Sequence, residues 1–297
     1  MIYFQGTTDF RLESPCAVTL GKFDGVHKGH QKLMQRIKDH EKNGVISCVF
    51  TLNPREEELI LTQEEQRNVI ASLGISALIK CPFVPEISSM HPDAFVREVL
   101  QKRLHAVYVA VGSDFRFGFR REGSASFLKE NEDRYGFAVD VIEKECYQGR
   151  EISSTYIREA MNDGNMELAQ ILLGRPFQVE GTIIHGRHLG TRMGMPTVNI
   201  IPPPSKLLPP NGVYESTSLV DGIWYRGVTN IGVKPTVKAS FRGVETFLFD
   251  CSQDLYGKDI HTCLHHFERP EIRFESIDAL KEQIQTDILR GREYFSE

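Results

Sequence analysis

Along the first half of the chain, short apolar runs alternate with segments whose apolar positions recur at helical spacing. The strand-like runs cover 17–20, 44–50, 77–80 and 106–111, and the helical segments cover 31–40, 64–73 and 92–103. Apolar strands that alternate with amphipathic helices are typical of βαβ units, in which helices cover both faces of a parallel sheet. This half is therefore predicted to be a doubly wound α/β domain.

The pattern changes after residue 176. Two short helical segments over 154–173 meet near Gly164, and Gly174-Arg175-Pro176 then ends the helical character. The β-type runs that follow are separated by Gly, Pro, Asn and Asp, and they cover 177–184, 212–220, 224–231, 244–250 and 260–267. Short strands with closely spaced turn residues are typical of a small antiparallel barrel.

Apolar residues at helical spacing over 277–291 predict a helix that closes the chain. With 297 residues, two cores are a better expectation than one. We therefore expect an α/β domain over 1–176, followed over 177–297 by a small antiparallel Greek-key β-barrel with a C-terminal helix.

Composition narrows the class of protein. Hydrophobic residues make up 40% of the chain, and no apolar run approaches the roughly 18 residues that a membrane span needs. The N-terminus lacks the pattern of a secretory signal, and the six cysteines form no CxxC pair, which disfavours zinc sites and disulfide frameworks. The net charge is −5, without a long basic stretch. We expect a cytoplasmic monomer or weak oligomer that binds small molecules, and neither nucleic acid nor membrane.

The strongest motif lies between the first strand and the first helix. It reads Gly21-Lys22-Phe23-Asp24-Gly25-Val26-His27-Lys28-Gly29-His30. Glycines allow backbone to approach a ligand closely, and a helix N-terminus after a strand offers free N–H groups and a positive dipole end to phosphate. His27 and His30 are neighbours on the first helical turn, so both imidazoles can face one phosphate. Taken alone, the pair also fits a solvated helix face.

Nucleotidyl transfer suits this motif. The attacking phosphate is already a nucleophile and pyrophosphate is a good leaving group. The protein therefore has to neutralise charge on the α-phosphate and hold the reactants in line, which imidazole donors and Mg²⁺ can do.

Two later segments add polar groups to this half. Gly112-Ser113-Asp114-Phe115-Arg116-Phe117-Gly118 follows a predicted strand, although its phenylalanines also fit a core. Ser153-Ser154-Thr155 opens a helix, and Arg158 stands one turn further on. Hydroxyls followed by an arginine fit a grip on a triphosphate, but alone they are more often a helix cap.

A second candidate site lies over 181–199. The segment combines a strand, glycines, two arginines and the element Pro196-Thr197-Val198-Asn199. A glycine-rich loop can close over ATP phosphates, and a hydroxyl with an amide oxygen provides hard ligands for Mg²⁺. It lacks the Gly-Lys-Ser/Thr of a Walker A loop, and by itself it also fits a glycine-rich hairpin.

The first motif resembles the HxGH nucleotidyltransferase superfamily, whose fold is Rossmann-like, and the chain as a whole resembles the bacterial bifunctional riboflavin kinase/FMN adenylyltransferases. The C-terminal part of the resemblance includes 212–214, 230–236, 244–246 and 254–258. The resemblance implies ATP-dependent phosphorylation of riboflavin to FMN and adenylylation of FMN to FAD, with Mg²⁺ as cofactor.

The same resemblance assigns roles to single residues. It implies His27, His30 and Glu245 as catalytic residues, with Glu245 as the base for the ribityl hydroxyl. Thr197 and Asn199 are the implied metal ligands. The implied nucleotide- and flavin-binding residues are Gly21, Phe23, Asp24, Gly25, Gly29, Asn53, Asp114, Ser153, Ser154, Thr155, Arg158, Gly186, Gly190, Arg192, Gly194 and Pro196.

The chain departs from the family after the second strand, where Asn53-Pro54-Arg55 replaces a proline–histidine–proline element. One alternative is therefore an enzyme with a single live activity, the kinase, which separate assays of the two halves would reveal. The other is a flavin- or nucleotide-responsive regulator, which would bind flavin without ATP turnover. A binding module needs neither a base nor metal ligands, so the presence of both histidines, Thr197, Asn199 and Glu245 speaks against this second alternative.

Overall fold

The computed structural model describes residues 1–53, 58–186, 195–235 and 240–296. The chain divides into two compact units, Met1–Ser154 and Thr155–Glu297. The helical segment 154–173, which the sequence analysis placed before the domain boundary, is grouped with the second unit. Each unit is described by itself.

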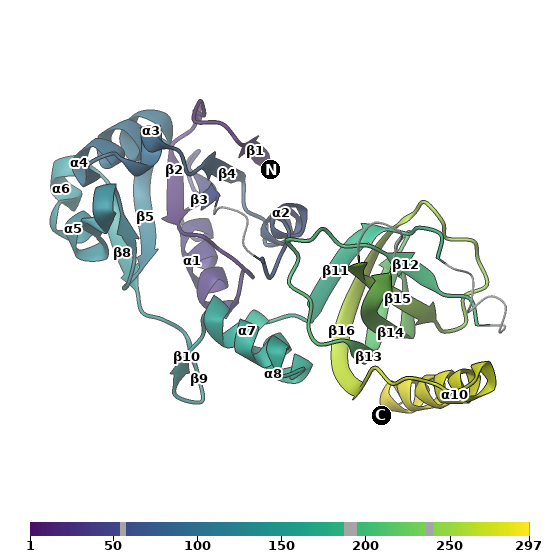
Figure 1. Cartoon of the computed structure of the whole chain (residues 1–297). Coiled ribbons are helices and arrows are strands. Elements are labelled where there is room, and N and C mark those ends of the chain that lie inside the picture. The colour runs from purple at the N-terminus through teal and green to yellow at the C-terminus, as the bar shows by residue number, and fades with distance from the viewer. Residues whose placement is uncertain (54–57, 187–194, 236–239, 297) are drawn as a thin grey trace. The chain divides into compact units, whose positions relative to one another are not determined.

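A six-stranded parallel sheet forms the centre of the first unit (Figure 1). Its order is β1-β4-β3-β2-β5-β8, so the chain moves outward in one direction from β2 through β3 and in the other through β5. The strands are β1 Ile2–Gln5, β2 Cys16–Leu20, β3 Ile46–Asn53, β4 Ala77–Pro82, β5 Ala106–Gly112 and β8 Ala138–Ile142. Because the strand order reverses between β2 and β5, a crevice is expected at their carboxyl ends, where such sheets bind ligands.

Helices cover both faces of this sheet, as predicted. Neighbouring strand residues point to opposite faces, so Ala17, Val49 and Leu78 belong to one core cluster, whereas Val18, Phe50 and Ile79 belong to another. The first cluster packs against α1 Lys28–Lys38 and α2 Gln63–Ser72. The second packs against α4 Pro92–Phe95, the π-helical segment Val96–Arg103 and α5 Ala125–Glu130.

The first unit also contains several short elements outside the main sheet. They are α3 Pro85–Ser88, β6 Arg116–Phe117, the 3₁₀ turn Phe119–Arg121, β7 Gly123–Ser124, α6 Glu132–Tyr135, β9 Cys146–Tyr147 and β10 Arg150–Glu151. Strands β1 and β8 extend the sheet beyond the four strands that the apolar pattern singled out. The strand predicted over 44–50 begins two residues later and continues to Asn53.

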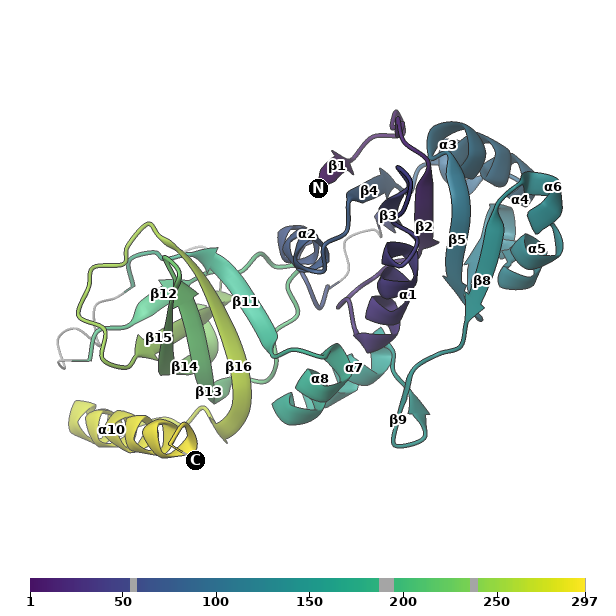
Figure 2. The same cartoon turned by 180° about the vertical axis from the view of Figure 1, so that it is seen from behind.

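The second unit begins at Thr155 and opens with the predicted pair of short helices, α7 Ser154–Asn162 and α8 Met166–Leu173. Its six-stranded antiparallel sheet has the order β11-β16-β13-β14-β15-β12 (Figure 2). The strands are β11 Phe177–Thr182, β12 Val198–Ile200, β13 Gly212–Val220, β14 Ile223–Pro235, β15 Ser240–Leu248 and β16 Asp259–Pro270. Helix α10, Ile277–Tyr294, follows the sheet.

This sheet has Greek-key connectivity, because β13, β14 and β15 form a meander and β16 then returns to lie beside β13. It is strongly curled, since a bridge between Ile184 and Asn199 joins the chain just after β11 to β12 at the opposite edge. The predicted fold class is thus confirmed, with the barrel realised as a curled antiparallel sheet.

The two faces of the curled sheet differ in chemistry. One face buries hydroxyls that satisfy each other: Thr229 Oγ1 lies 2.7 Å from Ser216 Oγ and 2.8 Å from Thr246 Oγ1. On the opposite face Val213 and Val228 pack with Ile288 of α10. Helix α10 covers only part of that second face, and the candidate site of this unit lies there.

Candidate active sites

The first candidate site is the connection between β2 and α1, at the sheet's switch point. Its backbone turns sharply: Phe23, Gly25 and Val26 have φ values of 52°, 81° and 43°. Positive φ is ordinary for glycine but costs on the order of 1–3 kcal/mol for a bulky or β-branched residue. Phe23 and Val26 are 1% and 0% exposed, so burial of their side chains holds this strained turn in place.

Both predicted histidines lie at the start of α1. His27 is the N-cap residue, 6% exposed, and its ring stacks on that of His30 with centroids 3.6 Å apart. Phe23 meets the His30 ring edge-on at 5.1 Å, so Phe23 supports a histidine from within the core. The first turn of α1 carries no acidic residue, which suits the binding of an anion at its N-terminus.

Gly29 leaves room for this ring pair. A Cβ on Gly29 would lie 3.3 Å from the His27 ring, closer than most real Cβ contacts. A side chain at this position would therefore displace His27.

Two polar side chains from outside the motif hold its loop. The Gln66 amide of α2 donates to the carbonyls of Lys22, at 3.2 Å, and Phe23, at 2.9 Å. The Ser154 hydroxyl donates to the Asp24 carbonyl at 2.9 Å, and the Asp24 carboxylate accepts the Ile60 N–H at 3.0 Å. Gln66 was missed by sequence reasoning, because only the packing of α2 under the loop reveals its role.

The other predicted residues of this half are placed at strand and helix ends. Asn53 is the last residue of β3, Gly21 follows β2, and Asp114 follows β5. Asp114 is exposed and pairs with Lys144 at 3.0 Å; hydrogen bonds from Lys144 to Glu151 and Asp114 raise the pKa of Lys144.

Three further predicted residues of this half lie at the start of α7 or within it. Ser153 precedes α7, whereas Thr155 and Arg158 lie on α7 in the second unit, and their roles stay predictions. Of the two aromatic residues after β5, Phe117 is buried in the core beside Phe95 at 5.4 Å, which supports the core interpretation for that ring.

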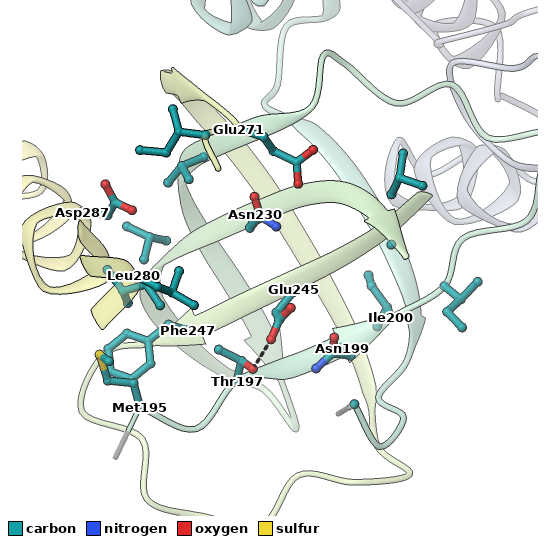
Figure 3. A pocket seen from close by; sticks show the side chains of 18 of the residues that line it. Met195, Thr197, Asn199, Ile200, Asn230, Glu245, Phe247, Glu271, Leu280 and Asp287 are labelled. Carbon is teal, nitrogen blue, oxygen red and sulfur yellow. Dashed lines mark hydrogen bonds between the residues drawn. The ribbon is translucent and has the colours of Figure 1, made fainter. Parts of the chain in front are cut away.

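The second candidate site gathers polar side chains from neighbouring strands (Figure 3). Glu245 of β15 is directly opposite Asn199 of β12 on one side and Asn230 of β14 on the other. The Thr197 hydroxyl donates to Glu245 Oε1 at 2.6 Å. Residues directly opposite each other point to the same face of a sheet, so these groups converge although they are far apart in sequence.

These groups lie at one end of a cavity of about 630 Å³ on the face that α10 partly covers. The apolar part of the lining includes Val213, Val228 and Phe247 of the sheet, with Leu280 and Ile284 of α10. An apolar slot with a few convergent polar groups is the usual form of a small-molecule site.

A buried ion pair fastens the wall of this cavity. Arg269 of β16 donates to both carboxylate oxygens of Asp287 on α10, at 2.8 and 2.6 Å, and Asp287 is 3% exposed. Gln283 adds a hydrogen bond to Asp287 at 2.9 Å. Sequence reasoning also missed Asn230 as a member of the site and this ion pair, since each depends on register or helix docking.

The glycine-rich segment is described in part. A Cβ on Gly186 would lie 2.6 Å from the Asn199 amide nitrogen, so this glycine gives Asn199 its space. Pro196 is exposed and precedes Thr197. The His185 ring lies 3.7 Å from that of Tyr256, in the turn over 254–258. The predicted residues Gly190, Arg192 and Gly194 lie outside the described residues.

The donor set of the second site suits Mg²⁺. Thr197, Asn199 and Glu245 present a hydroxyl, an amide and a carboxylate, and their oxygens are of the hard type that this ion prefers. We therefore find the side chains compatible with a bound Mg²⁺.

Comparison with known proteins matches both parts of the chain. The model of the riboflavin kinase family matches residues 173–295, and the model of the FAD synthetase family matches residues 10–156. The bifunctional riboflavin kinase/FMN adenylyltransferase of Escherichia coli K12 is 36% identical over 94% of this chain and 93% of its own. That of Haemophilus influenzae is 32% identical over 96% of both chains.

Among solved structures, a crystal structure of a macrolide-efflux protein from Streptococcus pneumoniae is similar over 96% of both chains. Its TM-score is 0.85 and its sequence identity is 28%. Among the described residues of the present chain, no helix combines the length and apolar character needed to span a bilayer.

Proposed function

The chain belongs to the family of bifunctional riboflavin kinase/FMN adenylyltransferases, and from this membership we propose how its two sites divide the work. The part over 177–297 transfers the γ-phosphate of ATP to riboflavin and makes FMN. The part over 1–176 then transfers the adenylyl group of a second ATP to FMN, which gives FAD and pyrophosphate. The family membership rests on relatives that match nearly the whole chain.

Convergence of Glu245, Thr197, Asn199 and Asn230 at one end of an apolar cavity supports the kinase assignment. The isoalloxazine ring of riboflavin is flat and largely apolar, which suits walls made by Val228, Phe247 and Leu280. The ribityl chain then extends toward the polar end. There Glu245 accepts the proton of the terminal hydroxyl as that oxygen attacks phosphorus.

Thr197 orients this base. Its hydroxyl donates to Oε1 of Glu245 at 2.6 Å, and this hydrogen bond fixes the direction of the carboxylate. Thr197 and Asn199 would hold Mg²⁺, which supplies neutralisation of the phosphate charge when it is bound.

The adenylyl site is proposed to act through position and charge. His27 and His30 donate hydrogen bonds to phosphate oxygens, and the start of α1 adds backbone N–H groups and its dipole. The phosphate of FMN needs no base, because it already attacks as an anion. The hydrogen bonds from Gln66 and Ser154 keep the loop in the shape that places both rings together.

The proposed setting is a cytoplasmic one, in which a monomer or weak oligomer acts on small molecules and on no nucleic acid. The absence of long basic stretches and the net charge of −5 support this last point.

A time course tests the assignment directly. The purified full chain is incubated with riboflavin, ATP and MgCl₂, and flavins are resolved by chromatography. We expect FMN to rise first and FAD to follow. If FMN accumulates alone, the adenylyl role of the first unit is wrong. The altered Asn53-Pro54-Arg55 segment is then the first cause to test. If FMN never forms, the kinase assignment is wrong, and FMN supplied directly then tests the first unit separately.

A further inference from the structure

A buried carboxylate in the second unit lies outside both sites described above. Glu215 of β13 is 1% exposed, and its Oε2 receives no hydrogen bond from the part of the chain that the structure describes. Burying a charged carboxylate without a partner costs several kcal/mol. A cation bound beside Glu215 would offset this cost.

Two further potential ligands face the same point. Glu215 is directly opposite His266 of β16, and the register between these strands then skips Glu268, which is the extra residue of a bulge. Bulges redirect side chains, and here one ligand atom from each of Glu215, His266 and Glu268 lies within 4.8 Å of the others. A buried carboxylate with an unpartnered oxygen thus belongs to a cluster with an imidazole and a second carboxylate.

The surroundings prepare His266 to act as a ligand. Its Nδ1 lies 2.5 Å from Glu167 Oε1 of α8, and its ring stacks on Tyr294 of α10 at 5.8 Å. A carboxylate that accepts the proton of one ring nitrogen leaves the lone pair of the other for a metal, and such carboxylate–histidine pairs accompany most histidine ligands. The partner fixes both the tautomer and the direction of the ring.

The local charge also favours a cation. The carboxylates of Glu167, Glu215 and Glu268 lie around one imidazole, and among the described residues the arginine that contacts this group is Arg290, which donates to Glu268 Oε1. Arg269 is already committed to Asp287. His266 must be neutral to bind a metal, so Arg290 alone would not balance the three carboxylates, whereas a divalent ion beside it would.

We propose that Glu215, His266 and Glu268 bind a Zn²⁺ ion that fastens β13 to β16 beneath the end of α10. One nitrogen and two carboxylate oxygens form a donor set that suits Zn²⁺ better than Mg²⁺, which prefers oxygen alone. The site is separate from Thr197 and Asn199, whose strand β12 lies at the sheet edge beside β15. The role of this site is structural, because it joins two strands and none of its three ligands lines the flavin cavity.

Zinc binding by the full chain tests this site. The protein is stripped with a chelator, kept in a reductant that does not bind zinc, and equilibrated with Zn²⁺ in excess Mg²⁺; bound metal is then measured by elemental analysis. We expect one Zn²⁺ per chain to be bound and the unfolding temperature of the second unit to rise with zinc, as binding to the folded state requires. If the wild-type chain binds no Zn²⁺, the proposal is overturned.

Variants separate this site from adventitious zinc. Glu215→Gln and His266→Ala should weaken binding at least about tenfold, and Glu167→Gln should weaken it by about the same factor or less, because it acts through His266. Glu282→Gln, an exposed carboxylate on α10, serves as the control and should bind as the wild type does. Glu215→Gln removes an unpartnered buried charge, so its metal-free form should fold at least as well as the wild type. Unchanged zinc binding by folded Glu215→Gln would refute the site.

Discussion

The two active sites of this chain are built in different ways. The adenylyl site is made by a contiguous loop, in which a strained backbone turn from Gly21 to His27 places two rings at a helix start. The kinase site is made by regular strands, and its side chains come from β12, β14 and β15. The first site depends on the conformation of one segment, whereas the second depends on the register between segments.

This difference bears on how each site can be damaged. A change in the first site acts through backbone shape and the room around the histidines, so small residues matter there as much as the histidines do. A change in the second site acts through the side chain itself, because the strand backbone is held by its ladder hydrogen bonds. The following experiments test this contrast, beginning with the largest expected effect.

Glu245→Gln should give the largest loss. The amide keeps the shape of the carboxylate but cannot accept the substrate proton, so FMN formation should fall about 10³-fold, within the range of general-base catalysis. Riboflavin should still bind, and the conversion of supplied FMN to FAD should be unchanged. Initial rates with riboflavin and with FMN measure the two steps separately. Wild-type kinase turnover in this variant would remove Glu245 from the mechanism.

His27→Ala should lower FAD formation from supplied FMN about 10²-fold, the magnitude expected when one donor to a developing charge is lost. The kinase rate of the same variant should remain at the wild-type level. Because His27 is 6% exposed, thermal unfolding of the variant has to be recorded, and His27→Asn is the milder companion that keeps a polar group. FAD synthesis at the normal rate by either variant would contradict the assigned role.

Two glycine substitutions form a matched pair across the sites. Gly29→Ala pushes on the His27 ring, and Gly186→Ala pushes on the Asn199 amide. We expect Gly29→Ala to lower adenylylation about tenfold while stability holds or rises, since alanine favours a helix by up to about 1 kcal/mol over glycine. Gly186→Ala should instead raise the Mg²⁺ concentration needed by the kinase. Each variant serves as the control for the other activity. If Gly29→Ala impaired the kinase, or Gly186→Ala impaired adenylylation, the contrast between the two sites would be wrong.

The contrast between the sites also explains what sequence could predict. His27, His30 and the glycines lie within one ten-residue span, so their spacing along the chain is enough to predict that they lie together at a helix start. Glu245 was found only through a family resemblance, because its neighbours Asn199 and Asn230 come beside it through strand pairing. Asn230 as a site member, Gln66 under the loop, and the Arg269–Asp287 pair depend on register and helix docking, for which local periodicity carries no signal.

Two buried charges, Asp287 in the second unit and Lys80 in the first, differ in whether a counter-ion accompanies them, and alkaline pH provides the smallest test. In the second unit, Asp287 is buried with Arg269 as its counter-ion. In the first, Lys80 of β4 is 2% exposed, and its ammonium donates to the Gln63 carbonyl at 3.1 Å, with no carboxylate partner among the described residues. Burial, with a smaller effect of Arg67, lowers the pKa of Lys80 to about 8.

A lysine whose pKa is lower in the folded state binds fewer protons there than in the unfolded chain. Stability of the first unit should therefore rise with pH through the window between the folded pKa of about 8 and the ordinary value of 10.5. From about pH 7.5 to about pH 9 the expected gain is about 1 kcal/mol. Lys80→Met provides the reference, since its denaturation curves lack this contribution and share all other titrations. Equal pH dependence in the two proteins would show that water or an anion reaches the ammonium, and the charge of Lys80 would then be compensated, as that of Asp287 is.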